Sequence, residues 1–199
     1  MSSHHIIRDE QEPALIIAEL EPESKSIARQ FLEWSPTLIV LENCLSEVVQ
    51  WGIKIDIAFV NRSNFESVED LLQDQMPVKI LTCKSSEEQL TTALYFLIAG
   101  RHRAANMMAN EKIDLLKSLQ SVSNSLSVGI INSNGKANLF QGKFKKWMAK
   151  DSVIKVIRTK GNQTFIIKGV RELEGVFICL SDSFVEIKSN YPFWLSQSL

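Results

Sequence analysis

Pro13-Ala14-Leu15-Ile16-Ile17-Ala18-Glu19-Leu20 is an apolar run that a proline opens and an acid interrupts. A run of this length predicts a strand that is buried on both faces, as in a parallel sheet. In such sheets ligands bind at the carboxyl ends of the strands, where glycine usually lets the backbone approach a phosphate. Here an acid that repels phosphate and a bulky leucine follow the strand. The run therefore predicts a ligand-binding scaffold without the usual phosphate contacts.

Short apolar runs alternate with helical patterns over the first two-thirds of the chain. The expected strands are Ala14–Ala18, Thr37–Leu41, Ile55–Val60, Val78–Thr82, Ala104–Met108 and Leu126–Ile131. The expected helices are Ser26–Leu32, Leu45–Trp51, Val68–Gln73, Glu87–Ala99 and Ile113–Val122. Gly52 and Gly100 each follow a helix, where a left-handed cap favours glycine. The alternation predicts an α/β fold, a Rossmann-like and mostly parallel sheet with helices on both faces.

The pattern changes after about Gln141. Short runs rich in β-branched and aromatic residues follow, at Val153–Arg158, Thr164–Lys168, Val176–Leu180, Phe184–Lys188 and Phe193–Leu195. Turn signals such as Gly161-Asn162 separate them, and no helical period is present. We predict an α/β domain over residues 1–142 and a small, sandwich-like antiparallel β domain over residues 143–199. A linker at Phe144–Trp147 would join them, with its aromatics packed and its lysines pointing outward.

The composition argues against several classes of function. The net charge of −1 gives no attraction to nucleic acid, and no apolar run approaches the ~20 residues that span a membrane. The polar N-terminus has no signal-peptide pattern. The whole chain contains three histidines, which gives little basis for a histidine metal site. Cys44, Cys83 and Cys179 lie far apart in apolar surroundings, which favours buried thiols in a cytoplasmic protein and gives a catalytic cysteine little support.

Several segments match those of a known family in order and spacing. They are His4-His5-Ile6-Ile7-Arg8-Asp9, Glu12–Ala18, Leu32–Thr37, Gly52–Asp56, Ala93 with Phe96-Leu97-Ile98, Lys143–Trp147 and Asp182–Ile187. Along nearly its whole length the chain resembles the thiamine pyrophosphokinases. The resemblance implies an ATP-binding α/β domain, a thiamine-binding β-sandwich and a homodimer. It also implies transfer of a diphosphate from ATP to thiamine, with magnesium held by acidic side chains.

The residues that would carry this chemistry differ at each matched position. Where the family has Asn-Gly after the first strand and Asp-Gly after the second, this chain has Glu19-Leu20 and Glu42-Asn43. The family's Gly-Asp-x-Asp after the third strand falls on Val60-Asn61-Arg62-Ser63, and its Thr-Asp before the long helix falls on Glu88-Gln89. Its glycine-rich segment ending in Asp-His falls on Ala109–Leu116. The thiamine-contacting Ser-Asn is replaced within Gly169–Gly175. Gly52 is the only glycine before Gly100, and no glycine-rich phosphate loop can be assembled.

These differences predict a degenerate member that has lost catalysis and keeps a binding or regulatory role. If each preorganised charge or metal ligand stabilises the transition state by ~3 kcal/mol, the loss of one such group slows the reaction roughly 10²-fold. The candidate binding residues are the relic cleft positions Glu19, Glu42, Asn61 and Arg62; no catalytic or metal-binding residue is assigned, and no cofactor is expected. The expected partners are a second copy of the chain and a small molecule related to thiamine, with no nucleic acid and no membrane.

Two alternatives stay open. One is an active transferase that uses magnesium and ATP, with Glu19, Glu42, Glu88 and Asp114 as replacement acids. The other is a structural or interaction protein whose cleft is filled by side chains such as Leu20.

Other local patterns have structural interpretations. Ser86–Gln89 fits a capping box at a helix start, and Asp56 lies within a predicted strand. Gly100–Arg103 is typical of a solvated turn, and Trp51 with Met107-Met108 is typical of core. Tyr191–Trp194 would be buried either within the β domain or against a partner subunit.

Overall fold

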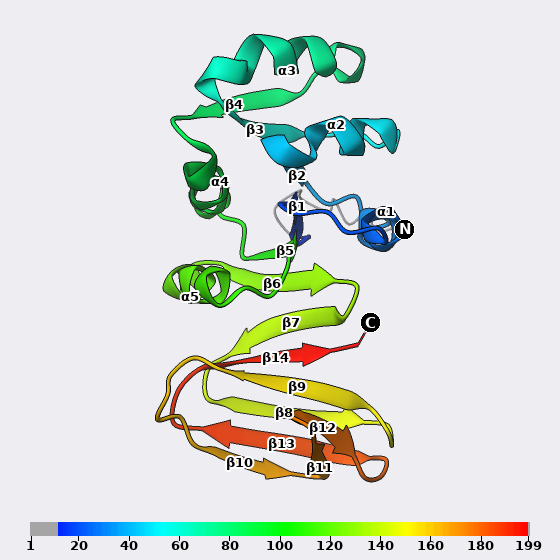
Figure 1. Cartoon of the computed structure of the whole chain (residues 1–199), viewed down its shortest axis with the longest axis vertical. Helices are drawn as coiled ribbons and strands as arrows, with labels where there is room; N and C mark the ends of the chain where they lie inside the picture. Colours follow the sequence, from blue (N-terminus) through cyan, green and yellow to red (C-terminus); the bar gives the residue numbers. More distant parts are fainter. Residues whose placement is uncertain (1–11, 199) are drawn as a thin grey trace, which may run out of the picture.

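Helices alternate with strands and are then replaced by strands alone, in the predicted order (Figure 1). The computed structural model describes residues 12–198, so the matched segment from His4 to Asp9 lies outside it. The helices are α1 (Ser24–Leu32), α2 (Glu42–Gln50), α3 (Phe65–Leu71), α4 (Ser86–Ala99) and α5 (Ile113–Val122), with 3-10 turns η1 (Arg62–Asn64) and η2 (Gln73–Gln75). The strands are β1 (Ala14–Ile17), β2 (Leu38–Leu41), β3 (Ile57–Asn61), β4 (Lys79–Cys83), β5 (Ala104–Met108), β6 (Ser127–Asn132), β7 (Gly135–Phe140), β8 (Lys143–Met148), β9 (Val153–Arg158), β10 (Phe165–Lys168), β11 (Val170–Leu173), β12 (Val176–Cys179), β13 (Ser183–Ser189) and β14 (Phe193–Gln197).

The parallel part of the large sheet has the strand order β6-β5-β1-β2-β3-β4. β1 lies inside this sheet and its residues are fully buried, as the apolar run predicts. The chain passes outward from β1 to β4 and then returns to the other side of β1 to form β5. The strand order therefore reverses between β1 and β5. Doubly wound sheets bind ligands beside such a reversal.

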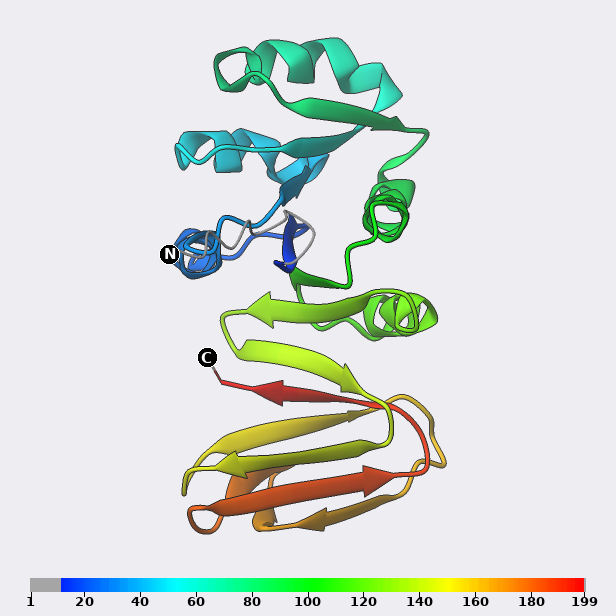
Figure 2. The same ribbon diagram turned by 180° about the vertical axis from the view of Figure 1, so that it is seen from behind.

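Helices cover both faces of the parallel sheet, as Figure 2 shows from behind. α1, α2 and α3 bury side chains such as Ile27, Leu45 and Val68 on one face. α4 and α5 bury Leu97 and Leu119 on the other face. The predicted α/β class is confirmed. Within residues 12–198, no helix is both long and apolar enough to cross a membrane.

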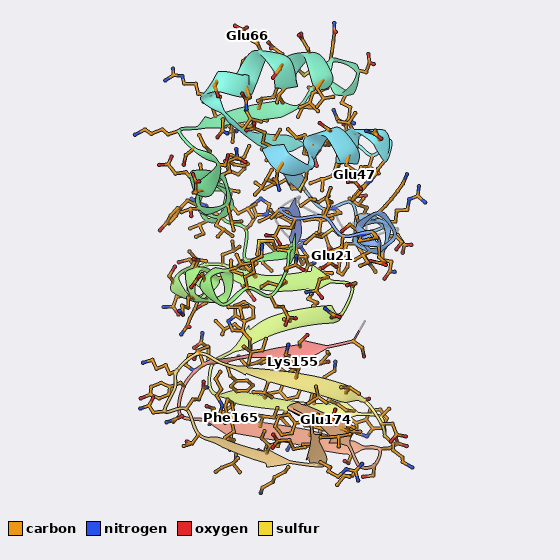
Figure 3. The ribbon with its side chains drawn as sticks, in the orientation of Figure 1. Glu21, Glu47, Glu66, Lys155, Phe165 and Glu174 are labelled. Atoms are coloured by element: carbon orange, nitrogen blue, oxygen red, sulfur yellow. The ribbon has the colours of Figure 1, made fainter. Side chains whose placement is uncertain are left out.

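The last third of the chain forms a two-layer β structure, in the lower half of Figure 1. β7, β14, β9, β12 and β11 continue the large sheet, and β10, β13 and β8 form a second, antiparallel sheet. Phe144 and Val185 from the small sheet meet Ile154 and Phe193 from the large sheet in one core. Phe165, labelled in Figure 3, packs against this core from β10. The predicted sandwich-like β region is confirmed.

The strands β7, β8 and β11 lie where the sequence predicts none. β8 has the sequence Lys143-Phe144-Lys145-Lys146-Trp147-Met148. Its lysines obscure the alternation of apolar and polar residues that would predict a strand. The predicted linker at Phe144–Trp147 is wrong, because β8 pairs with β13 along its whole length. Phe144 is buried as predicted, but Trp147 is 54% exposed.

The two predicted glycine caps have different outcomes. Gly52 has the expected left-handed backbone, with φ at +69°. Gly100 has φ at −74° and still donates its N–H to the Phe96 carbonyl, so the left-handed position moves to Arg101, with φ at +62°. In the same turn His102 is buried, so the predicted solvated turn holds for Gly100 and the two arginines but not for His102. The predicted core positions Trp51, Met107 and Met108 are buried.

The large sheet runs without a break across residue 142, the predicted domain boundary. β7 pairs with β6 on one side and with β14 on the other. Trp194 of β14 lies in the same core as Leu116 and Leu119 of α5, while Phe193 lies in the β core. The segment Tyr191–Trp194 thus buries its last two residues within the chain. The division into two domains stays a prediction.

Gly135 tests how closely β7 and β14 must approach. It has φ at +134°, and a Cβ there would lie 1.9 Å from the Gln197 carbonyl oxygen. We expect Gly135→Ala to lower the free energy of unfolding by roughly 2 kcal/mol, measured by urea denaturation. Gly161→Ala is the control, because a Cβ there meets nothing within 4 Å. Equal effects of the two substitutions would contradict this account.

Candidate functional site

A cavity of about 680 Å³ lies at the carboxyl ends of β1, β2 and β5, beside the reversal of strand order. Ligand sites in proteins commonly have volumes of this size. The residues that line it are Ala18, Glu19, Leu41, Glu42, Asn43, Ser46, Ser86, Glu87, Gln89, Leu90, Ala109, Lys112 and Leu115. We call this space the sheet-edge cavity.

Three helices begin at the sheet-edge cavity: α2, α4 and α5. The N-terminus of a helix favours negative charge, since its first amides point outward without partners. Glu42 lies in the first turn of α2, and Glu87 lies in the first turn of α4. Glu19 reaches Lys112, the residue that precedes α5. The chain thus places its own carboxylates at the positions where a bound anion would be favoured.

Amide groups from three elements hold the carboxylate of Glu42. Its Oε2 accepts hydrogen bonds from the Asn61 backbone N–H at 2.5 Å and from Gln89 Nε2 at 3.0 Å. Its Oε1 accepts from Asn64 Nδ2. The side chain of Gln89 is buried and returns the contact, since its Oε1 accepts from the Glu42 backbone N–H at 3.3 Å. We call Glu42, Asn61, Asn64 and Gln89 the amide clamp.

The carboxylate of Glu19 is also engaged by the protein. Its Oε1 lies 2.5 Å from Lys112 Nζ, and its Oε2 accepts the Asn110 backbone N–H at 3.1 Å. Burial alone would raise the pKa of Glu19, but the hydrogen bonds from Lys112 and Asn110 and the charge of Lys112 together hold that pKa below its ordinary value of 4.5. Glu19 is therefore ionised at neutral pH.

Cys44 lies on α2 near these carboxylates. Burial, together with the charges of Glu19 and Glu47, raises the pKa of the Cys44 thiol to about 12. A thiol with such a pKa is protonated at neutral pH and is a poor nucleophile. Cys83 and Cys179 are also buried and free, as the sequence predicts.

The structure brings together some of the predicted site residues and separates others. Glu19 and Glu42 line the sheet-edge cavity, and Asn61 holds Glu42. Arg62 lies exposed in η1 and is not part of the lining. Of the two other replacement acids, Glu88 does not line the cavity, and the exposed Asp114 lies 3.6 Å from Lys117.

Two structural interpretations are wrong in detail. The residue before α4 is Ser85, and Gln89 contacts Glu42 instead of closing a capping box with Ser86. Asp56 precedes β3 and accepts the Leu38 N–H at 2.8 Å, at the end of the sheet away from the cavity.

Sequence reasoning did not assign Asn64, Glu87 or Lys112 to the site. Asn64 and Glu87 carry no signal beyond lying near the ends of β3 and β4. Lys112 could have been found, because it follows the strand β5 that neighbours β1. The carboxyl ends of neighbouring parallel strands lie together, which brings Lys112 to Glu19.

The residues present do not fit a magnesium site of the kind that the resemblance implies. Magnesium takes oxygen ligands, chiefly carboxylates and water. Over residues 12–198, no group of three or more His, Cys, Asp or Glu side chains could hold a metal ion. The oxygens of Glu42 and Glu19 already accept hydrogen bonds from amides and from Lys112.

Comparison with known proteins identifies the fold. No family model and no curated protein matches the sequence. Thiamine pyrophosphokinase from Bacillus subtilis superposes with a TM-score of 0.69 at 11% identity, over 94% of this chain and 98% of that chain. The enzyme from Geobacillus thermodenitrificans superposes with a TM-score of 0.67 at 12% identity, over 94% of this chain and 97% of that chain. The enzyme from Candida albicans superposes with a TM-score of 0.66 at 6% identity, over 96% of this chain and 90% of that chain. The chain has a thiamine pyrophosphokinase-like fold. The predicted resemblance is thus confirmed at the level of the fold.

The amide clamp predicts a specific loss of stability. In Glu42→Gln an amide NH₂ group replaces one acceptor oxygen and faces donors. We expect the free energy of unfolding to fall by roughly 1–2 kcal/mol, measured by urea denaturation. Glu47→Gln is the matched control, because Glu47 is an exposed glutamate on the same helix α2 (Figure 3). An effect no larger than that of the control would count against the clamp.

The ion pair of Glu19 predicts a pH dependence. A carboxyl group whose pKa is lowered by folding stabilises the protein above its ordinary pKa of 4.5, and this stabilisation is lost as the pH falls through the folded pKa. The difference in unfolding free energy between the unmodified protein and Glu19→Gln should therefore be largest at about pH 7 and shrink towards about pH 3. Urea denaturation across this range measures it. A difference that does not change with pH would refute the assignment.

Proposed function

We propose that this thiamine pyrophosphokinase-like protein has no diphosphotransferase activity and acts as a binding or regulatory protein for a small organic cation related to thiamine. The observation that carries the proposal is the capture of Glu42 by the amide clamp. In a diphosphotransferase this edge of the sheet must hold a metal and a triphosphate. Here the carboxylate oxygens are committed to protein amides.

The charge balance of the sheet-edge cavity supports a cation as the ligand. Glu19, Glu42 and Glu87 line it, and Lys112, the one cation among the lining residues that the structure describes, already pairs with Glu19. A triphosphate would add several negative charges to this surface, whereas a thiazolium or similar cation would reduce the repulsion. Apolar lining from Leu41, Leu90 and Leu115 suits the ring of such a molecule.

The active transferase remains the alternative, and the cavity itself is the observation that favours it. The space is open, and three carboxylates border it. Magnesium could enter only if Glu42 exchanged amide donors for the metal. The purely structural alternative expects Leu20 in the cleft, but Leu20 packs against the core on the α1 and α2 face and does not line the cavity.

We also propose that the protein is a cytoplasmic homodimer, as the sequence and the resemblance imply. Free, buried cysteines suit a reducing compartment. Trp147 and Phe184 face each other across β8 and β13, and both are more than half exposed. Ile166 on the neighbouring strand β10 is 62% exposed. Apolar side chains gathered on one sheet commonly mark a contact surface.

Calorimetry and a product assay test the proposed function. We expect heat of binding with thiamine, none with ATP and magnesium, and no thiamine diphosphate from the three together. Glu87→Gln removes a cavity charge and should weaken thiamine binding roughly two- to fivefold, while Glu47→Gln should not. Formation of thiamine diphosphate, or ATP binding that magnesium strengthens, would establish the transferase instead. No binding of any of these ligands would favour the structural alternative.

A further inference from the structure

A second cavity, of about 290 Å³, lies between α5 and the loop that follows β9. We call it the helix-α5 cavity. Leu116, Ile157 and Trp194 supply its apolar surface, and Lys117, Arg158 and Lys160 surround it with positive charge. Over residues 12–198 it shares no lining residue with the sheet-edge cavity. Its volume suits a ligand with a single ring.

Trp194, which lines this cavity, carries a buried and unpartnered polar atom. The side chain is 1% exposed, and among the described residues no acceptor bonds its Nε1. A buried indole N–H normally has a partner, and leaving one unsatisfied destabilises the protein. Because this atom has almost no exposed surface, an acceptor on a molecule in the cavity would satisfy it once the indole turns its N–H edge towards the cavity.

Among the described residues that line the helix-α5 cavity there is no acid, so the charged ones all have the same sign. The Arg158 guanidinium is already engaged, because it donates to the Gln163 carbonyl. Lys160 Nζ lies 4.3 Å from the centroid of the Tyr191 ring, which leaves its donors free for an anion. Lys117 Nζ is 3.6 Å from Asp114, and both side chains are well exposed, so this pair contributes little and can open.

We propose that the helix-α5 cavity binds a small aromatic carboxylate that carries a second oxygen. The ring lies against Leu116, Ile157 and the indole of Trp194. The carboxylate faces Lys117 and Lys160, and the second oxygen accepts the Trp194 Nε1–H. This site is separate from the one in the proposed function and does not depend on it.

Three related probes separate the contributions of the ring, the carboxylate charge and the second oxygen to binding. 4-Hydroxybenzoate has the ring, the charge and a distal oxygen; benzoate lacks the oxygen, and 4-hydroxybenzamide lacks the charge. In a ¹⁵N–¹H spectrum, 4-hydroxybenzoate should shift one indole N–H resonance, the one that Trp194→Phe removes. The resonances of Trp34, Trp51 and Trp147 should stay in place. Benzoate and 4-hydroxybenzamide should each bind roughly tenfold more weakly.

Variants give the second test. Trp194→Phe removes the indole N–H and leaves a smaller ring in the core, so it should lower the thermal stability, lose roughly tenfold in affinity for 4-hydroxybenzoate and keep its affinity for benzoate. The double variant Lys117→Gln, Lys160→Gln should bind both carboxylates more weakly, whereas Lys84→Gln, an exposed lysine outside the cavity, should not. The proposal is overturned if the Trp194 resonance does not move at millimolar 4-hydroxybenzoate, or if the uncharged amide binds equally well.

Discussion

The capture of Glu42 by amide groups joins the parts of the molecule that form the sheet-edge cavity. One carboxylate at the start of α2 accepts the backbone N–H at the end of β3 and the side chain of Gln89 in α4. The last residue of β3, Asn61, also bonds Ser86 at the start of α4. These contacts fix three chain segments at the edge of the sheet where the strand order reverses. The same contacts use the oxygens that a metal would need.

Helices that begin at the carboxyl edge of a parallel sheet favour negative charge at that edge. In a nucleotide-binding protein a bound phosphate supplies this charge. In this chain the side chains of Glu42, Glu87 and Glu19 supply it, and Lys112 forms an ion pair with Glu19. The fold does not depend on this charge, because it rests on the buried strands and on the two helical layers. What differs is the charge at the edge.

The two cavities have opposite character because different elements surround them. Carboxylates near the helix starts line the sheet-edge cavity. The helix-α5 cavity lies where the parallel and antiparallel parts of the large sheet share a core, and lysines border it. Trp194 is a residue of this shared core and also forms part of the surface of the helix-α5 cavity. A ligand there would touch both the helical and the β parts of the chain.

Much of the fold could be predicted from the sequence, since apolar runs such as Ala14–Ile17 and the glycine at Gly52 report local structure directly. β8 could not, because Lys146 interrupts the alternation on the face that carries the buried Phe144 and Met148. At the site, Glu19 and Glu42 could be placed from their positions after β1 and β2. The bond from Gln89 to Glu42 could not, because it joins residues 47 apart in the chain, and a capping box explains the same local sequence.

The proposed function depends on Glu42 being held by amides and unavailable to a metal ion. Titration with paramagnetic Mn²⁺, followed by ¹⁵N–¹H resonances, tests it most directly. We expect the Asn61 backbone amide and the Gln89 side-chain amide to keep their line widths, like amides far from the cavity. Selective broadening of these two resonances that Glu42→Gln abolishes would contradict it.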